Sequence, residues 1–301
     1  MVRENRAVKY KITHVTNYDY TEVVPVCQNI VHLTPRATSR QKCLTHRLMV
    51  RPQPAEVSRR TDFFGNVVQD FSIHQGHRSL RVVAVSKVQV HEKSVANPAD
   101  APTWNALREQ VETARTKSAL YAYQFCFASP HVTACEELAA YARESFPQNR
   151  SILLAARELN ERIHADFTYD PQATDVQTPC LDVFRQRRGV CQDLAHVAIG
   201  CLRSLGVPAR YVSGYLRTIP PAGRPRLVGA DASHAWFSVY CGPLGWIDFD
   251  PTNDLLPNTD HITVAWGRDY SDVAPIRGMF VGGGQHRLSV SVDVLPHDLA
   301  E

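Results

Sequence analysis

The change in hydrophobic periodicity along the chain is the feature that most constrains its fold. From Lys9 to about His91, short runs alternate apolar and polar residues as half-buried strands do, and turn-rich pieces separate them. From about residue 106 to residue 167, apolar positions recur at helical spacing instead. After Pro208 the strand-like runs return, and they include RLSVSVDV near the end of the chain. The pattern predicts an all-β, sandwich-like region followed by an α+β region.

A stretch with Pro98 and Pro102 among small and polar residues separates the two patterns. We therefore expect an N-terminal β domain over residues 1–95, and a linker with a second domain over residues 96–301. Thr133 and Ser151 precede two of the predicted helices and are candidate caps.

Composition excludes several classes of function. The 33 basic and 30 acidic side chains give a formal net charge of +3, which provides little attraction for nucleic acid or an anionic membrane. The first residues contain no apolar run of signal-peptide length, and no run of about 18 apolar residues occurs anywhere. The eight cysteines are scattered without a CxxC pair, unlike a disulfide scaffold. We expect a cytoplasmic protein with reduced thiols and no membrane or nucleic-acid partner.

Cys191 stands at the start of a predicted helix. A buried helix to about Leu205 is predicted by the apolar stripe Leu194, Ala198, Leu202 and Leu205. The first turn of a helix favours an anion, and thiols so placed can have a pKa lowered to roughly 3.5–7.5. Gly189 leaves room in front of the thiol, whereas packing explains Cys201 on the same helix. Cys191 is therefore a candidate nucleophile.

A thiol that attacks an amide carbonyl needs an imidazole to carry the proton and a carboxylate to orient that imidazole. ASHAWFSVY predicts a strand with His234, and WIDFDPTN predicts a second strand that forms a hairpin with the first. Asp248 and Asp250 share one predicted face of the second strand, so spacing alone leaves both as partners of His234. Pro251 ends the strand directly after Asp250, which places Asp250 at a rim where a cleft can open.

Other constellations give weaker indications. Cys191 and His196 lack the remaining members of a four-ligand zinc set, so we expect no metal and no cofactor. Residues 218–231 predict a long loop beside the site, rich in Pro, Gly and Arg. We interpret three arginines as solvated charges, with contact to an acidic substrate as the alternative: Arg217 just before the loop, and Arg224 and Arg226 within it.

Three segments together resemble the signature segments of the transglutaminase-like superfamily: RRGVCQDLAHVAIGCLRSLGVPARYVSGYL, ASHAWFSVY and GWIDFDPTN. The opening YKITHVTNYDYTEVVPVCQNIVHLTPR is similar to the N-terminal domain of a bacterial branch of that superfamily, and the region between is matched only loosely. The resemblance implies a papain-like fold for the second domain. It also implies a catalytic triad of Cys191, His234 and Asp250, the aspartate that precedes Pro251.

The chemistry that the resemblance implies is an acyl-thioester formed at an amide bond of a peptide or protein substrate. Resolution by water gives a thiol peptidase or amidase, which is our expectation. Resolution by a lysine or polyamine gives a protein-glutamine transglutaminase, and a noncatalytic binding or scaffold module is the other alternative. The sequence makes no prediction of oligomeric state.

Several further residues have expected roles near the thiol. The backbone N–H of Cys191 is the natural first donor to an oxyanion. Tyr169 corresponds to an aromatic-rich segment of similar proteins, so its hydroxyl is a candidate second donor, with packing as the alternative. Gln192 and Asp193 are candidates for organising the site, although a helix start also favours Asp for its dipole alone. For the N-terminal domain we predict a packing or substrate-positioning role.

Overall fold

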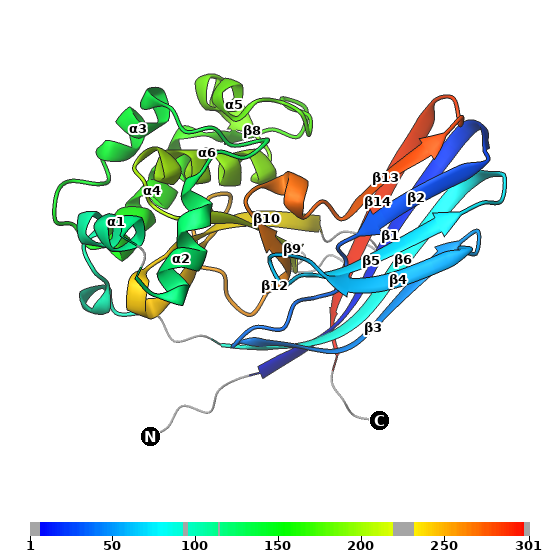
Figure 1. Cartoon of the computed structure of the whole chain (residues 1–301), viewed down its shortest axis with the longest axis horizontal. Helices are drawn as coiled ribbons and strands as arrows, with labels where there is room; N and C mark the ends of the chain where they lie inside the picture. Colours follow the sequence, from blue (N-terminus) through cyan, green and yellow to red (C-terminus); the bar gives the residue numbers. More distant parts are fainter. Residues whose placement is uncertain (1–6, 93–95, 114, 219–231, 298–301) are drawn as a thin grey trace, which may run out of the picture.

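The computed structural model describes residues 7–92, 96–113, 115–218 and 232–297. Figure 1 shows two regions side by side, one of long strands and one of helices around a shorter sheet. We call them the β unit and the core unit. The predicted order, an all-β region before an α+β region, is confirmed.

The helices of the described residues belong to the core unit, and none of them is long and apolar enough to cross a membrane. They are α1 (Trp104–Glu112), α2 (Lys117–Tyr123), α3 (Glu136–Arg143), α4 (Ile152–Asp166), α5 (Cys180–Gln186) and α6 (Cys191–Ser204). Its strands are β7 (Thr168–Tyr169), β8 (Arg188–Gly189), β9 (Ala209–Leu216), β10 (Ala232–Tyr240), β11 (Trp246–Phe249) and β12 (His261–Gly267).

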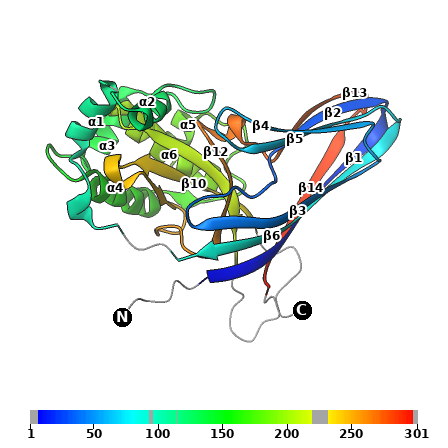
Figure 2. The same ribbon diagram turned by 60° about the horizontal axis from the view of Figure 1, so that its bottom comes forward.

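The β unit is a sandwich of two antiparallel sheets, with strand orders β14-β1-β6-β3 and β13-β2-β5-β4. Figure 2 shows the two sheets converging at the end away from the core unit. The strands are β1 (Ala7–Val24), β2 (Val26–Val31), β3 (Gln41–Arg51), β4 (Glu56–Thr61), β5 (Val67–Ile73), β6 (His77–His91), β13 (Ile276–Val281) and β14 (His286–Pro296).

The last two strands correct the sequence-based placement of the C-terminal segment. The expected second domain ran to residue 301, but β14 pairs with β1 and β13 pairs with β2. Each of these pairs joins residues more than 240 positions apart, for example Tyr10 with Pro296. The alternation of RLSVSVDV predicts a strand correctly, yet local periodicity carries no information about the partner strand. The β unit is therefore closed by the end of the chain.

The core unit is built around α6 and the antiparallel sheet β11-β10-β9-β12. The apolar stripe predicted for α6 is buried, and the helix packs on β10 and β9 with α3, α4 and α5 around it. Because α6 is covered on nearly every side, its first residue is held in a fixed position relative to β10. This contact brings the start of α6 to the strand that carries His234.

The two units share one hydrophobic core. Tyr10 and Ile12 of β1 and Val294 of β14 pack in the same buried cluster as the apolar residues of α6 and β9. A second, smaller cluster fills the sandwich itself. Across the junction, the Arg36 guanidinium of the β unit stacks 3.5 Å from the ring centre of Trp266 on β12. The β unit is thus fixed against the core unit by apolar burial and by this stacked contact.

The predicted caps are only partly placed as expected. The N-cap of α3 is Cys135, so the prediction of Thr133 is wrong. Ser151 does occupy the N-cap position of α4, but its hydroxyl donates to the carbonyl of Pro98 instead of accepting from its own helix. The sequence analysis also missed β12, whose alternating residues HITVAWG are a recognisable strand signal.

Candidate active site

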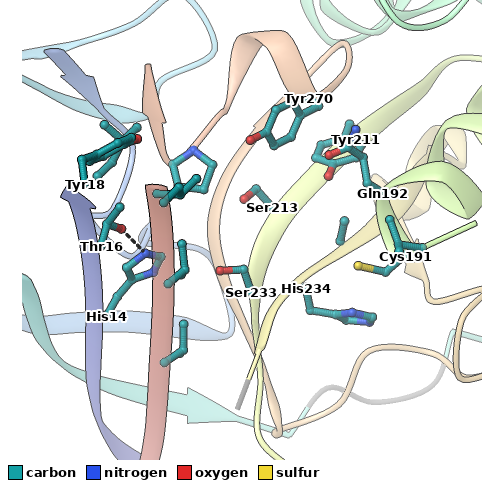
Figure 3. Close-up of a pocket in the computed structure, with 17 residues that line it drawn as sticks. His14, Thr16, Tyr18, Cys191, Gln192, Tyr211, Ser213, Ser233, His234 and Tyr270 are labelled. Carbon is teal, nitrogen blue, oxygen red and sulfur yellow. Dashed lines mark hydrogen bonds between the residues drawn. The ribbon is translucent and has the colours of Figure 1, made fainter. Parts of the chain in front are cut away.

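Cys191 is the first residue of α6 and is half-buried. The helix start is held by the Asp193 carboxylate, which accepts a 2.8 Å hydrogen bond from the N–H of Val190 and a hydrogen bond from Thr174. In Figure 3 the Cys191 sulfur points toward the His234 ring. Cys191 acts on that imidazole and contributes to raising its pKa.

The space at Gly189 differs from the expectation. A Cβ placed there would lie 2.6 Å from a carboxylate oxygen of Asp193. Asp193 therefore fills the space that the sequence analysis assigned to the approach in front of the thiol. Gly189 is required because the buried Asp193 side chain folds back over it to bind Val190.

His234 lies on β10 and binds Asp250 through its Nε2 atom, 2.7 Å from the carboxylate oxygen Oδ2. Nδ1 is then left for the thiol. Burial opposes the charged imidazolium, but hydrogen bonds and charge from Asp250 and Cys191 outweigh it and raise the pKa of His234 to about 10. The imidazole is therefore protonated at neutral pH beside the ionised Asp250 carboxylate.

Asp250 follows β11 directly and is fully buried. Its Oδ1 accepts the backbone N–H of Thr252, and its Oδ2 accepts the side-chain amide of Asn253 at 2.8 Å. Burial alone would raise the pKa of Asp250, but hydrogen bonds from His234, His261 and Asn253 hold it well below its usual range. The turn after Pro251 thus supplies donors that keep this carboxylate ionised inside the protein.

Asp248 has a different environment. It pairs across the hairpin with Ser238. Its charge acts on the half-buried Arg40 and the buried Arg210, neither of which lines the thiol pocket. Of the two aspartates that the spacing left open, the structure brings Asp250 to His234 and leaves Asp248 beside a separate pocket.

His261, on β12, is a member of this cluster that sequence reasoning missed. Its Nε2 lies 3.1 Å from the same Asp250 oxygen that His234 binds. Its Nδ1 accepts the backbone N–H of Asn258, so the proton sits on Nε2 and is donated to Asp250. Burial lowers the pKa of His261 despite the carboxylate. His261 is therefore a neutral donor, and only the missed strand β12 would have pointed to it.

A pocket of about 450 Å³ opens in front of Cys191 and His234. Figure 3 shows that its far wall comes from the β unit, where His14, Thr16 and Tyr18 lie on β1. Gln192 lines the same pocket as the thiol. Asp193 is buried and does not belong to the lining. Sequence analysis predicted a packing or substrate-positioning role for the N-terminal domain but named none of these residues.

Tyr169 is the last residue of β7 and is half exposed. β7 pairs with β8, which ends two residues before Cys191. Burial and the nearby Cys191 raise the pKa of the Tyr169 phenol, so the hydroxyl is a donor at neutral pH. Arg217 pairs with Asp260 at 3.1 Å, while Arg224 and Arg226 lie outside the described residues.

His234, Asp250 and His261 are also the one group of described residues with the spacing of a metal-ligand set, their ligand atoms lying within 4.8 Å of one another. Each of these atoms already takes part in the hydrogen bonds to Asp250. These hydrogen bonds account for the close spacing of the three side chains. His196 accepts the N–H of Tyr270 and stacks on His131, which places it in another buried cluster.

Comparison with known proteins agrees with this architecture. Residues 10–89 match the model of the bacterial transglutaminase-like N-terminal region, and residues 139–251 match that of the transglutaminase-like superfamily. An uncharacterised protein of Mycobacterium tuberculosis (strain ATCC 25618 / H37Rv) is 38% identical over 299 residues, covering 96% of this chain and 93% of its own length. One from Mycobacterium leprae (strain TN) is 33% identical over 289 residues, covering 95% and 98%.

Among solved structures, a candidate cysteine protease from Cytophaga hutchinsonii superposes with a TM-score of 0.74 at 23% identity, covering 98% of this chain and 93% of its own. At that identity the likeness establishes the fold. The two family matches and the near full-length relatives establish the family. The chain belongs to the transglutaminase-like superfamily and carries that superfamily's bacterial N-terminal region.

Proposed function

We propose that this protein cleaves or transfers acyl groups at amide bonds through a thioester on Cys191, with His234 as proton carrier and Asp250 as its orienting carboxylate. The observation that carries the proposal is that Cys191 and His234 line one pocket and that His234 bonds to the buried carboxylate of Asp250 at 2.7 Å. The proposed substrate is a peptide or protein.

The chemistry requires two half-reactions. In the first, the Cys191 thiolate attacks the carbonyl carbon, a C–S bond forms and an electron pair moves to the oxygen. His234 then gives its Nδ1 proton to the nitrogen, and the amine leaves. In the second, water or another amine gives a proton to His234 as it attacks the thioester, and the sulfur departs as thiolate. No oxidant or metal enters this balance.

Charge arrangement supports these roles. The raised pKa of His234 favours an imidazolium beside the thiol at neutral pH, and the lowered pKa of Asp250 keeps the carboxylate from taking that proton itself. The amide of Cys191 has no partner within its helix, because the first N–H groups of any helix lack one. We assign it as first donor to the oxyanion, with Tyr169 and Gln192 as candidates for the second.

Hydrolysis, as in a peptidase or amidase, is the net reaction that we favour. The described residues that line the pocket include no Asp or Glu to pair with the ammonium of an incoming lysine. One finding favours amine transfer instead: a protein-glutamine gamma-glutamyltransferase of Pseudomonas aeruginosa is 31% identical over 121 residues, although these cover 40% of this chain and 18% of that protein.

Glutamine-containing peptides, with and without a primary amine, separate the two reactions. We expect ammonia release or peptide cleavage at rates that the amine does not increase. Amine incorporation that outpaces hydrolysis would reverse our order.

The assignment of the nucleophile is tested by Cys191→Ala, which should abolish turnover, and by alkylation with iodoacetamide at pH 6. Cys135 provides an internal control, because it is also a half-buried free cysteine at a helix start. We expect Cys191 to react at least about tenfold faster than Cys135. Equal rates would favour a noncatalytic scaffold.

We also propose a cytoplasmic location and a substrate-positioning role for the β unit. The first is supported by the eight cysteines, all of which are free thiols. The second is supported by the contribution of β1 and β14 to the pocket wall.

A further inference from the structure

The pocket wall that faces Cys191 consists of two neighbouring strands of the β unit. β1 and β14 are antiparallel, and their register places three pairs directly opposite one another: His14 with Val292, Thr16 with Val290 and Tyr18 with Leu288. Side chains of opposite residues project from the same face of a sheet. All six line the pocket, so alternate residues of both strands form one continuous surface.

Uncovered apolar groups occupy the β14 half of this surface. Leu288 and Val290 are each 52% exposed. Because successive side chains of a strand point to opposite faces, their neighbours Ser289 and Ser291 face away from this surface. Strand alternation thus places the apolar residues of RLSVSVDV toward the reactive thiol and the serines toward the other face. Both side chains line the pocket in front of Cys191 and His234.

The remaining described lining is neutral. Burial lowers the pKa of His14 to about 4, so it carries no charge at neutral pH, and both its ring nitrogens are bonded, to Tyr215 and Thr16. Hydroxyl groups come from Tyr211, Ser213 and Tyr270 (Figure 3). Apart from Cys191 and His234 of the proposed triad, the described lining holds no other group charged at neutral pH, because it contains no Asp, Glu, Lys or Arg.

We propose that this pocket binds an uncharged, apolar side chain of the substrate, next to the carbonyl that Cys191 attacks, and that Val290 and Leu288 set the preference. The proposal rests on the proposed thiol chemistry and names its substrate class. An apolar group entering here loses water and contacts β14. A lysine or glutamate side chain would lose water without gaining an opposite charge, which is costly.

Three chloromethyl ketones test this preference on the whole protein: those of N-acetyl-leucine, N-acetyl-lysine and N-acetyl-glutamate. The Cys191 thiolate displaces chloride and forms a C–S bond, so each probe is consumed one to one, and mass spectrometry gives its second-order rate. Each rate is divided by the iodoacetamide rate of the same protein. We expect the leucine probe to react at least about tenfold faster than either charged probe.

Val290→Asp should lower the ratio of the leucine-probe rate to the lysine-probe rate at least about tenfold. The new carboxylate pairs with the lysine ammonium and replaces an apolar surface that the leucine side chain would contact. Leu288→Asp provides the same test at a second position if the first variant is poorly folded. Ser289→Asp is the matched control, since it adds the same charge on the same strand toward the opposite face, and it should leave the ratio unchanged.

Outcomes separate this inference from the proposed function. If Cys191 reacts with iodoacetamide no faster than Cys135, the thiol chemistry itself is wrong. If Cys191 is activated but the three probes react equally in the parent protein, or Ser289→Asp changes the ratio as much as Val290→Asp does, the apolar specificity of this pocket is wrong while the proposed chemistry stands.

Discussion

Two buried histidines of the core unit, each near a buried aspartate, have opposite protonation behaviour. His234 bonds directly to Asp250, and its pKa is raised to about 10. For His196, burial outweighs the charge of Asp269 and lowers the pKa to about 3, with Arg203 acting in the same direction. Of these two histidines, only the one whose ring bonds directly to a carboxylate is protonated at neutral pH.

The carboxylates explain the difference. Asp269 is occupied by the backbone N–H of His131 and by Ser271, so its oxygens hold a turn in place. Asp250 also accepts hydrogen bonds from the chain, but one oxygen is directed at His234. His196 lies five residues after Cys191 in the sequence, whereas His234 lies 43 residues away and is the one that meets the thiol. Proximity along the chain is misleading here.

The largest effect that separates the two pairs is expected from Asp250→Asn. An amide cannot stabilise the imidazolium and favours the wrong tautomer of His234, so kcat/KM should fall by roughly a thousandfold to ten-thousandfold. Iodoacetamide alkylation of Cys191 at pH 6 should slow in parallel, because the protonated partner of the thiolate is lost. Steady-state kinetics on any substrate identified, and mass spectrometry of the alkylated protein, measure both.

Two variants serve as controls for that experiment. Asp269→Asn changes the other pair and should reduce stability without slowing alkylation at pH 6. Asp248→Asn changes the neighbouring strand position and should keep a rate near that of the parent. If Asp248→Asn costs as much as Asp250→Asn, the choice of orienting carboxylate is wrong.

A smaller effect is expected at His261, the second histidine that bonds to Asp250. Its Nε2–H steadies the Asp250 oxygen that also binds His234. His261→Phe removes this donor, and we expect kcat to fall about tenfold with KM little changed, because a hydrogen bond to a charged group contributes about 1.5–3 kcal/mol.

His261→Gln keeps an N–H at the same reach and should restore most of the lost rate. A purely packing role predicts the opposite order, since Phe fills the buried site better than Gln does. Full activity of His261→Phe would also contradict a positioning role.

The comparison also predicts the pH dependence of stability, in which His196 and His234 act in opposite directions. The unfolded pKa of histidine is about 6.5. Below pH 6.5 these histidines bind protons in the unfolded chain, whereas His196 and His14 of the native protein stay neutral because their pKa values are lowered. The free energy of unfolding should therefore fall toward pH 4 by about 1.4 kcal/mol per pH unit for each histidine. His234 holds a proton that the unfolded chain releases, so its contribution is present below pH 6.5 and is lost as the pH rises toward about 10.

Urea unfolding midpoints from pH 4.5 to 9 measure the stability loss on the acid side and on the alkaline side, which form the two limbs of the stability curve. His196→Phe should flatten the acid limb, and His234→Phe should flatten the alkaline limb. A His196→Phe protein whose acid limb is as steep as that of the parent would show that His196 is not held neutral in the native state.

The sequence by itself determined the features that depend on neighbouring residues. The stripe through Leu194 and Leu202 specifies α6 and so places Cys191 at a helix start. The hairpin of β10 and β11 is set by a short turn, and it carries His234 close to Asp250. Periodicity and turn chemistry are local properties, so they can be read without a structure.

Tertiary structure decided the features that depend on which distant surfaces bury one another. The strand at residues 286–296 could be predicted, but its pairing with β1 joins opposite ends of the chain and creates the wall of the pocket. The same holds for His261, which reaches Asp250 only because β12 pairs with β9. Period-two alternation says that a strand has an apolar face, and only packing determines whether that face meets a sheet, a helix or a reactive thiol.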